Sequence, residues 1–169
     1  MIAVKRIINY VNGTSDYGIW YSRDSNDWLV GYANADCFYV GNNLVSWMSK
    51  KQNSVFLSTA EVEYIVVGSC CAQLLWMKKL LHDYGIYQDT MYVFYDNTSA
   101  INLSKNPVQH LKSKHIEIRY HFIRDLVEEK IVCLEFINTT NQKADIFTKP
   151  LDGPRFESLR KTIDFSIIP

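Results

Sequence analysis

The chain has 169 residues, of which 18 are basic and 18 acidic, so its formal net charge is zero. At roughly 100–200 residues per domain, this length predicts one compact domain that can bury a core without disulfide or metal staples. The composition, 47% hydrophobic and 21% charged, is globular and excludes a disordered chain. The charge balance excludes a simple basic coat protein for nucleic acids, but it is compatible with a nucleic-acid enzyme, because a net sum hides local clusters.

Signals for secretion and membrane insertion are missing from the sequence. No apolar run reaches the ~18 residues of a membrane span, and residues 1–13 have neither the apolar core nor the cleavage site of a signal peptide. The cysteines contain no CxxC pair, so neither a zinc site nor a disulfide framework is predicted. We therefore expect reduced thiols in a cytoplasmic or nuclear protein.

The first half of the chain predicts a helix, several short strands and a long helix. Residues 3–11 suit a short helix that Asn12-Gly13 ends. Strand patterns, joined by tight polar turns as in an antiparallel meander, follow at 17–22, 28–34, 37–40 and 44–48. A capping box beginning at Ser58 then opens a helix over 60–84. This helix is apolar almost all round, which is typical of a central, buried helix.

The second half alternates strands and helices. Residues 91–95 are continuously apolar, which predicts a strand inside a sheet covered on both faces. Helices are predicted from Asp96 to about Ser104, over 112–130, over 142–148 and, loosely attached, over 154–163, and a further strand over 132–137. This order predicts an α/β fold, a mixed sheet with helices on its faces.

Acidic residues stand at the ends of several predicted elements. They are Asp36 after a meander strand, Glu61 and Glu63 at the start of the long helix, Asp96 after the buried strand, and Asp145 in a late short helix. Convergent carboxylates repel one another unless a cation binds, and oxygen-rich clusters suit Mg²⁺ or Mn²⁺. Each acid also has an ordinary interpretation as a helix cap or as a solvated acid at a helix start. Position alone leaves both interpretations open.

A basic segment lies between residues 105 and 124, where Glu117 is the one acid. Its cations suit phosphate contacts, although a solvated helix face is the alternative interpretation. They are Lys105, Lys112, Lys114, Arg119 and Arg124. The aromatic residues of the strands and turns are expected in the core, and not as base-stacking groups. They are Trp20, Trp28, Tyr32 and Trp47.

Three long segments, at 57–81, 94–125 and 141–151, resemble the ribonuclease H domain of copia-type retrotransposon polyproteins. Residues 3–21 look like the segment that joins the reverse transcriptase of that family to this domain. The resemblance extends from about Ala3 to Leu151. It implies an RNase H-like fold, with a mixed five-stranded sheet flanked by helices. It also implies three parts: a remnant of the connection at 1–24, the RNase H-like domain at 25–151, and a C-terminal tail at 152–169.

The resemblance assigns catalytic roles residue by residue. In "AEVEY", Glu63 matches the metal-binding acid of the catalytic helix, and Glu61 is left as the cap. "FYDNTSAI" places Asp96 as the second acid, and "NQKAD" places Asp145 as the last. The family's chemistry implies two Mg²⁺ or Mn²⁺ ions that activate a water and stabilise the leaving 3′ oxygen. The products would carry 5′-phosphate and 3′-hydroxyl ends.

The first carboxylate departs from the family pattern. The family's first strand usually reads like GYSDADW, whereas residues 31–36 read GYANAD, so Asn34 occupies the usual Asp position. The chain also looks shortened just after Asp36. Asp36 takes over if the strand continues, since residues two apart face the same side. Otherwise the site lacks a carboxylate and the domain is inactive. The shortening also leaves open a fusion of the first two strands, or their exchange in a homodimer.

The resemblance implies the RNA strand of an RNA–DNA hybrid as substrate. Double-stranded RNA is a second option, because it is also A-form and displays 2′-hydroxyls in the same groove. We expect a domain that stands alone, without a polymerase, and a plant origin. The alternative is a catalytically weakened, retroelement-derived module that binds duplex nucleic acid or a protein partner.

Overall fold

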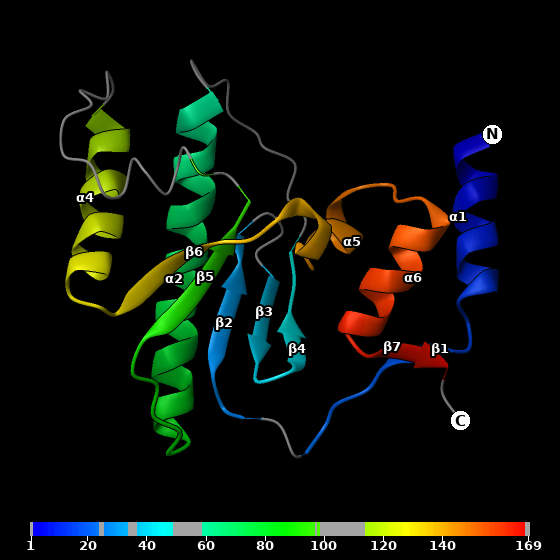
Figure 1. The fold of residues 1–169 in the computed structure, drawn as a ribbon, viewed down its shortest axis with the longest axis horizontal. Helices are drawn as coiled ribbons and strands as arrows, with labels where there is room; N and C mark the ends of the chain where they lie inside the picture. Colours follow the sequence, from blue (N-terminus) through cyan, green and yellow to red (C-terminus); the bar gives the residue numbers. More distant parts are fainter. Residues whose placement is uncertain are drawn as a thin grey trace.

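A computed structural model describes residues 2–23, 26–33, 37–48, 59–96, 98 and 114–167. In the helices that begin at Thr59 and Lys114, side chains are described from Ile65 and His121 onward. The main sheet has five strands in the order β4-β3-β2-β5-β6 (Figure 1). The strands are β2 (Leu29–Tyr32), β3 (Cys37–Val40), β4 (Asn43–Ser46), β5 (Met91–Tyr95) and β6 (Val132–Phe136). Antiparallel pairs join β2, β3 and β4, and parallel pairs join β2, β5 and β6. The predicted α/β fold is confirmed, and the topology is compatible with an RNase H-like fold.

The antiparallel half is a meander, as the turn residues predict. Tyr32 pairs with Cys37, so β2 and β3 are separate strands that pair within one chain and are not fused. A two-residue loop, Gly41-Asn42, joins β3 to β4. Gly41 has a φ of 60°, a conformation that costs least for a residue without Cβ, and its N–H donates to the Trp28 carbonyl at 2.8 Å.

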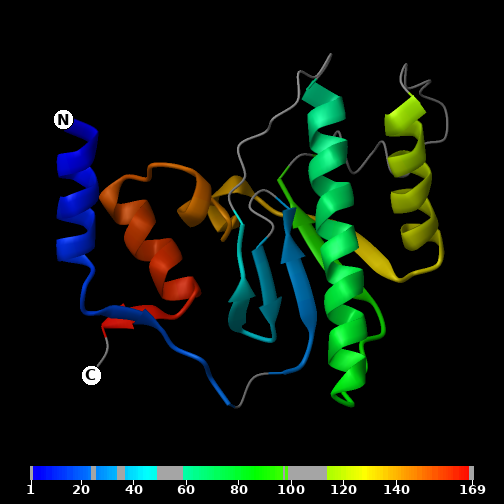
Figure 2. The same cartoon turned by 180° about the vertical axis from the view of Figure 1, so that it is seen from behind.

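Two helices, α2 (Thr59–Asp83) and α4 (Lys114–Glu128), cover one face of the sheet (Figure 2). The core between them and the sheet includes Met91, Val93 and Tyr95, the inward-facing residues of β5. The alternate residue Tyr92 stays 37% exposed on the other face. The expectation that this strand is covered on both faces along its length is therefore wrong. The prediction rested on the large aromatic residues of this strand, but the helices α2 and α4 cover only one of its two faces.

The second face is covered only in part. The 3₁₀ turn η2 (Thr139–Asn141) and the helices α5 (Asp145–Thr148) and α6 (Gly153–Thr162) follow β6. They pack over the meander through a smaller apolar cluster that includes Tyr32, Tyr39 and Ala144. Leu159 of α6 is buried, so this helix is packed in place and not loosely attached as expected.

The two ends of the chain meet in a second, two-stranded sheet. Strand β1 (Tyr17–Ile19), which follows helix α1 (Ile2–Gly13), pairs antiparallel with β7 (Phe165–Ile167). The sequence pattern did not indicate β7, because a strand of three residues is too short to show an alternation of apolar and polar residues. In the described part of the chain, no helix is long and apolar enough to cross a membrane.

Gly31 lets α2 approach β2 closely. A Cβ at this position would lie 2.9 Å from the Cys70 sulfur and 3.1 Å from Leu74 Cδ1, both on α2. Packing this tight leaves no room for a methyl group unless the Cys70 and Leu74 side chains shift or the helix moves. The glycine therefore sets the distance between the long helix and the strand at the centre of the sheet.

We expect Gly31→Ala to destabilise the fold by about 1–3 kcal/mol, the usual cost of overpacking a core. The measurement is the free energy of unfolding from urea denaturation. Gly13→Ala is the matched control, because nothing lies within 4 Å of the position that its methyl group would take. Equal stability of the two variants would contradict the close approach.

Burial raises the pKa of the Cys37 and Cys71 thiols to about 12. Since the thiolate is the nucleophile, both should resist alkylation at pH 8 in the folded protein. The half-buried Cys133 should react first. Peptide mapping after iodoacetamide treatment, with and without urea, measures this difference. Rapid labelling of Cys37 without urea would show that the smaller apolar cluster is open to solvent.

The carboxyl edge of the sheet

The parallel strands β2 and β5 end at the same edge of the sheet, which we call the carboxyl edge. Their register, from Val30 opposite Tyr92 to Tyr32 opposite Phe94, brings the two strand ends side by side. Asp96 directly follows β5, and Ala33 follows β2. The first turn of α2 lies toward this end of the molecule as well (Figure 1). Ligands of open α/β sheets commonly bind where parallel strands end.

The predicted acids differ in how much of them is described. Asp96 is described and half-buried. Glu61 and Glu63 lie within α2, but their side chains are outside the described residues, and Asn34 and Asp36 are outside altogether. Among the described side chains, no group of three or more His, Cys, Asp or Glu is placed to hold a metal ion. The metal-binding set Asp36, Glu63, Asp96 and Asp145 therefore stays a prediction.

Asp145 is buried and neutralised by two cations. Its side chain is 1% exposed. Arg155 in the first turn of α6 donates to Oδ2 at 2.7 Å, and the Lys149 ammonium lies 2.8 Å from Oδ1 in an ion pair without hydrogen-bond geometry. The spacing explains the second pair, because residues four apart share one helix face. A buried carboxylate needs such partners, since an unpaired charge away from water is costly.

The guanidinium of Arg155 also links three elements of this region. It donates to the Thr139 carbonyl of η2 at 2.6 Å in addition to Asp145 of α5. The Asp152 carboxylate caps α6 by accepting from the Arg155 backbone N–H at 2.8 Å. The arrangement fixes α5 and α6 relative to the end of β6. No sequence signal pointed to Arg155, because it lies ten residues beyond its partner in a segment expected to be a tail.

The basic segment is described only in part. Lys105 and Lys112 lie outside the described residues, and Lys114 and Arg119 lie in α4 with side chains that are not described. Arg124 is described, and its Nε lies 3.3 Å from Glu128 Oε1. The Arg124 Nε atom is buried without a hydrogen bond among the described residues, while Glu128 is 64% exposed, so the pair contributes little to stability. Phosphate contact by these residues remains a prediction.

The expectation of core tryptophans is wrong. Trp20 is 63% exposed, Trp28 66% and Trp47 49%, and only Tyr32 is buried. Trp28 precedes β2 and Trp47 follows β4, so both stand at strand ends. Trp47 stacks on Phe147 of α5, with ring centres 5.4 Å apart, and still stays half exposed. Hydrophobic type alone does not reveal which face of a sheet is left open.

Lys143 is a second residue to which no sequence signal pointed. Its ammonium lies 4.7 Å from the centre of the Tyr39 ring and 6.0 Å from that of Tyr32. Burial lowers the pKa of Lys143, and the nearby Cys37 thiol and Asp164 carboxylate oppose this shift. No local pattern signals this contact, because it depends on two tyrosines that neighbouring strands bring to the same face.

Comparisons with known proteins link the chain to mobile elements of plants. It is 34% identical over 95% of its length to the retrovirus-related Pol polyprotein from transposon TNT 1-94 of Nicotiana tabacum. It is 35% identical over 99% of its length to those from transposons RE1 and RE2 of Arabidopsis thaliana. The chain spans 12–13% of the length of these relatives. No family model and no solved structure matches.

Its homologues are retrotransposon Pol polyproteins. This relationship supports a retrotransposon-derived protein of plant type. The alignment with RE2 covers 182 residues, more than this chain contains, so the relative carries residues that are missing here. That difference agrees with the predicted shortening, and its position after Asp36 stays a prediction.

We expect Arg155→Met to lower the free energy of unfolding by about 2–3 kcal/mol. This is below the ~3–5 kcal/mol of a fully uncompensated buried charge, because Lys149 remains. Urea denaturation measures the loss, and Lys161→Met, on the exposed side of the same helix, is the control. Adding Asp145→Asn to Arg155→Met should recover part of the loss. No recovery would mean that Arg155 acts through packing and not through charge.

Proposed function

We propose that this chain is a metal-dependent endoribonuclease that hydrolyses RNA phosphodiesters in A-form duplexes. The observation that carries the proposal is the pairing of β2 with β5, which brings Asp96 to the sheet edge where β2 also ends. The relationship to retrotransposon Pol polyproteins supports a nuclease-type domain. RNA–DNA hybrid and double-stranded RNA both fit, because both present 2′-hydroxyls in a wide minor groove.

The acids of the carboxyl edge would hold two Mg²⁺ or Mn²⁺ ions. Their donor atoms are all carboxylate oxygens, which these hard cations prefer. Bound there, the ions would supply a more acidic water and a counter-charge for the leaving 3′ oxygen. Glu63 would bind metal, and Asp96 would bind metal and help position the attacking water. Hydrolysis would leave 5′-phosphate and 3′-hydroxyl ends. Asp145 would bind a metal ion only if its ion pairs with Lys149 and Arg155 were broken.

Substrate contacts would come from the basic segment. Lys105, Lys112, Lys114, Arg119 and Arg124 would bind backbone phosphates, which positions a duplex without reading its sequence. A net charge of zero gives weak long-range attraction to nucleic acid. The enzyme would therefore depend on recruitment by a protein partner, in the cytoplasm or the nucleus.

We expect Asp96→Asn to reduce duplex cleavage about 100-fold or more, because losing a metal ligand removes several kcal/mol of transition-state stabilisation. The assay uses labelled RNA–DNA hybrid, double-stranded RNA and double-stranded DNA with Mg²⁺ or Mn²⁺. Asp89→Asn is the matched control, since this exposed acid precedes the opposite end of the same strand. The absence of cleavage of any duplex by the unmodified protein would overturn the proposal.

The first carboxylate can be tested by exchanging the two candidates. Asp36→Asn should abolish cleavage if Asp36 has taken over the first metal-binding role. Asn34→Asp in that background should restore it, and alone should raise the rate on the order of tenfold, because a carboxylate binds Mg²⁺ better than an amide. An unaffected Asp36→Asn variant would move the role away from Asp36.

A second function is a duplex-binding module without catalysis. Two observations favour it: Asn34 stands where the family has an acid, and Asp145 is already neutralised by its own chain. This function gives duplex binding that weakens with salt and does not change when EDTA is added. Cleavage that requires a divalent metal would exclude it.

A further inference from the structure

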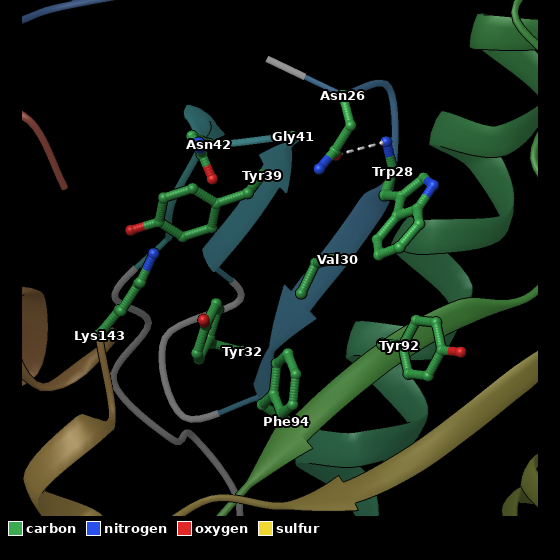
Figure 3. A pocket seen from close by; sticks show the side chains of 10 residues that line it. All are labelled: Asn26, Trp28, Val30, Tyr32, Tyr39, Gly41, Asn42, Tyr92, Phe94 and Lys143. Atoms are coloured by element: carbon green, nitrogen blue, oxygen red, sulfur yellow. Dashed lines mark hydrogen bonds between the residues drawn. The ribbon is translucent and has the colours of Figure 1, made fainter. Parts of the chain in front are cut away.

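The partly covered face of the sheet carries an open pocket of about 310 Å³ (Figure 3). It lies on the opposite side of the sheet from α2, and neither Asp96 nor Asp145 lines it. Val30, Tyr32 and Phe94 form its floor, while Trp28 and Tyr92 stand on one side and Tyr39 and Lys143 on the other. Asn26 lies next to Trp28, and Asn42 lies across the pocket beside Tyr39.

Aromatic rings dominate the lining of this pocket. Trp28 is 66% exposed, and Tyr92 is 37% exposed. Large aromatic surface in contact with water is costly unless a ligand covers it, and flat rings are best covered by another flat ring. On the floor, Tyr32 and Phe94 are already packed against each other, with ring centres 5.3 Å apart, so the exposed rings above them are the available ones.

Polar groups of a defined kind surround these rings. The Asn26 carbonyl oxygen accepts from the Trp28 backbone N–H at 3.1 Å, which leaves its amide nitrogen for another acceptor. Lys143 makes no ion pair within 4.0 Å with a described acid. The Tyr39 hydroxyl is buried, and burial together with the nearby Cys37, Tyr32 and Asp164 side chains raises its pKa, so it stays protonated and turned away from solvent. The site therefore offers amide donors and one cation.

We propose that this pocket binds a nucleotide of a single nucleic-acid strand, with the base on Trp28 and Tyr92 and a phosphate at Lys143. Bases stack on aromatic side chains whatever their identity, and a basic group tracks the backbone. The amides of Asn26 and Asn42 would meet the polar edge of the base. A purely apolar peptide would leave the ammonium and both amides without partners, so it fits this lining less well.

The direction of the pocket favours a strand over a free nucleotide. It follows β2 from Trp28 to Tyr32, a path of about 13 Å at ~3.3 Å per residue, and Tyr32 stands at the carboxyl edge. A single strand that leaves a duplex held at that edge would pass onto the open face. The inference takes its ligand class from the proposed function, but it requires binding only and no catalysis.

The test is fluorescence anisotropy with a labelled eight-nucleotide single-stranded RNA and its DNA counterpart, in EDTA so that no cleavage occurs. Trp28→Ala should weaken binding about tenfold, in line with the loss of one base–aromatic stack, and Trp28→Phe should retain most of the affinity. Trp76→Ala is the matched control, because Trp76 is 61% exposed on α2, across the sheet. Circular dichroism verifies that each variant is folded.

The charge contribution is tested separately. Lys143→Gln should weaken binding and lower the slope of log affinity against log salt by about one, as for one lost phosphate contact. Lys79→Gln, at an exposed position of α2, should change neither. A nucleoside 5′-monophosphate that competes as strongly as the unlabelled oligonucleotide would assign the pocket to a free nucleotide. That result would overturn the proposal that the pocket binds a nucleic-acid strand.

Two results would overturn the inference outright. One is no binding of either oligonucleotide by the unmodified protein, and the other is an equal loss in the Trp28→Ala and Trp76→Ala variants. Duplex cleavage is measured in parallel. Cleavage without single-strand binding would reject the pocket and leave the proposed function intact. Single-strand binding without cleavage would reject the nuclease and leave the pocket intact.

Discussion

The contact between Gly31 and α2 is the constraint on which the arrangement of the sheet depends. Because Cys70 and Leu74 occupy the space where a side chain would stand, the long helix lies directly on β2. With the helix on one face, the crossover from β4 can deliver β5 parallel to β2, and this pairing places Asp96 beside the end of β2. The opposite face of the sheet is covered in part by α5 and α6, and the open pocket lies on that face.

The net charge is zero, but individual charged side chains differ in whether the protein itself supplies their partners. Asp145 is satisfied inside the protein by Lys149 and Arg155, which ties α5 to α6. Lys143, two residues earlier, lies against the rings of Tyr32 and Tyr39, and the nearby Cys37 thiol and Asp164 carboxylate favour its charged form. An acid that is already paired resists a metal ion, whereas a half-buried cation that has no described acid within 4.0 Å can still bind an anion. Two residues of one short segment therefore differ: Asp145 resists a cation while it is paired, whereas Lys143 is available to an anion.

Local signals were enough to predict most of the fold. The apolar run Met91–Tyr95, the capping box before Thr59 and the glycine turn at Gly41 each specify their element within a few residues, and the structure has all three elements. The features that the sequence did not predict depend on tertiary contacts. Strand β7 exists because β1 lies beside it, and the exposure of Trp28 depends on which face lacks a helix. Of the candidate site, the sequence could place Asp96 at a strand end, but it could not show that Arg155 returns to Asp145.

The open face also bears on how a neutral nuclease would hold its substrate. Backbone contacts by a few cations lose affinity steeply with salt, because each contact releases counterions. Stacking on Trp28 and Tyr92 does not depend on counterions, so it would persist at physiological ionic strength. A domain with no net positive charge gains more from such contacts than a basic one does. If both surfaces act together, junctions between duplex and single strand would be held better than either part alone, because the second contact becomes intramolecular.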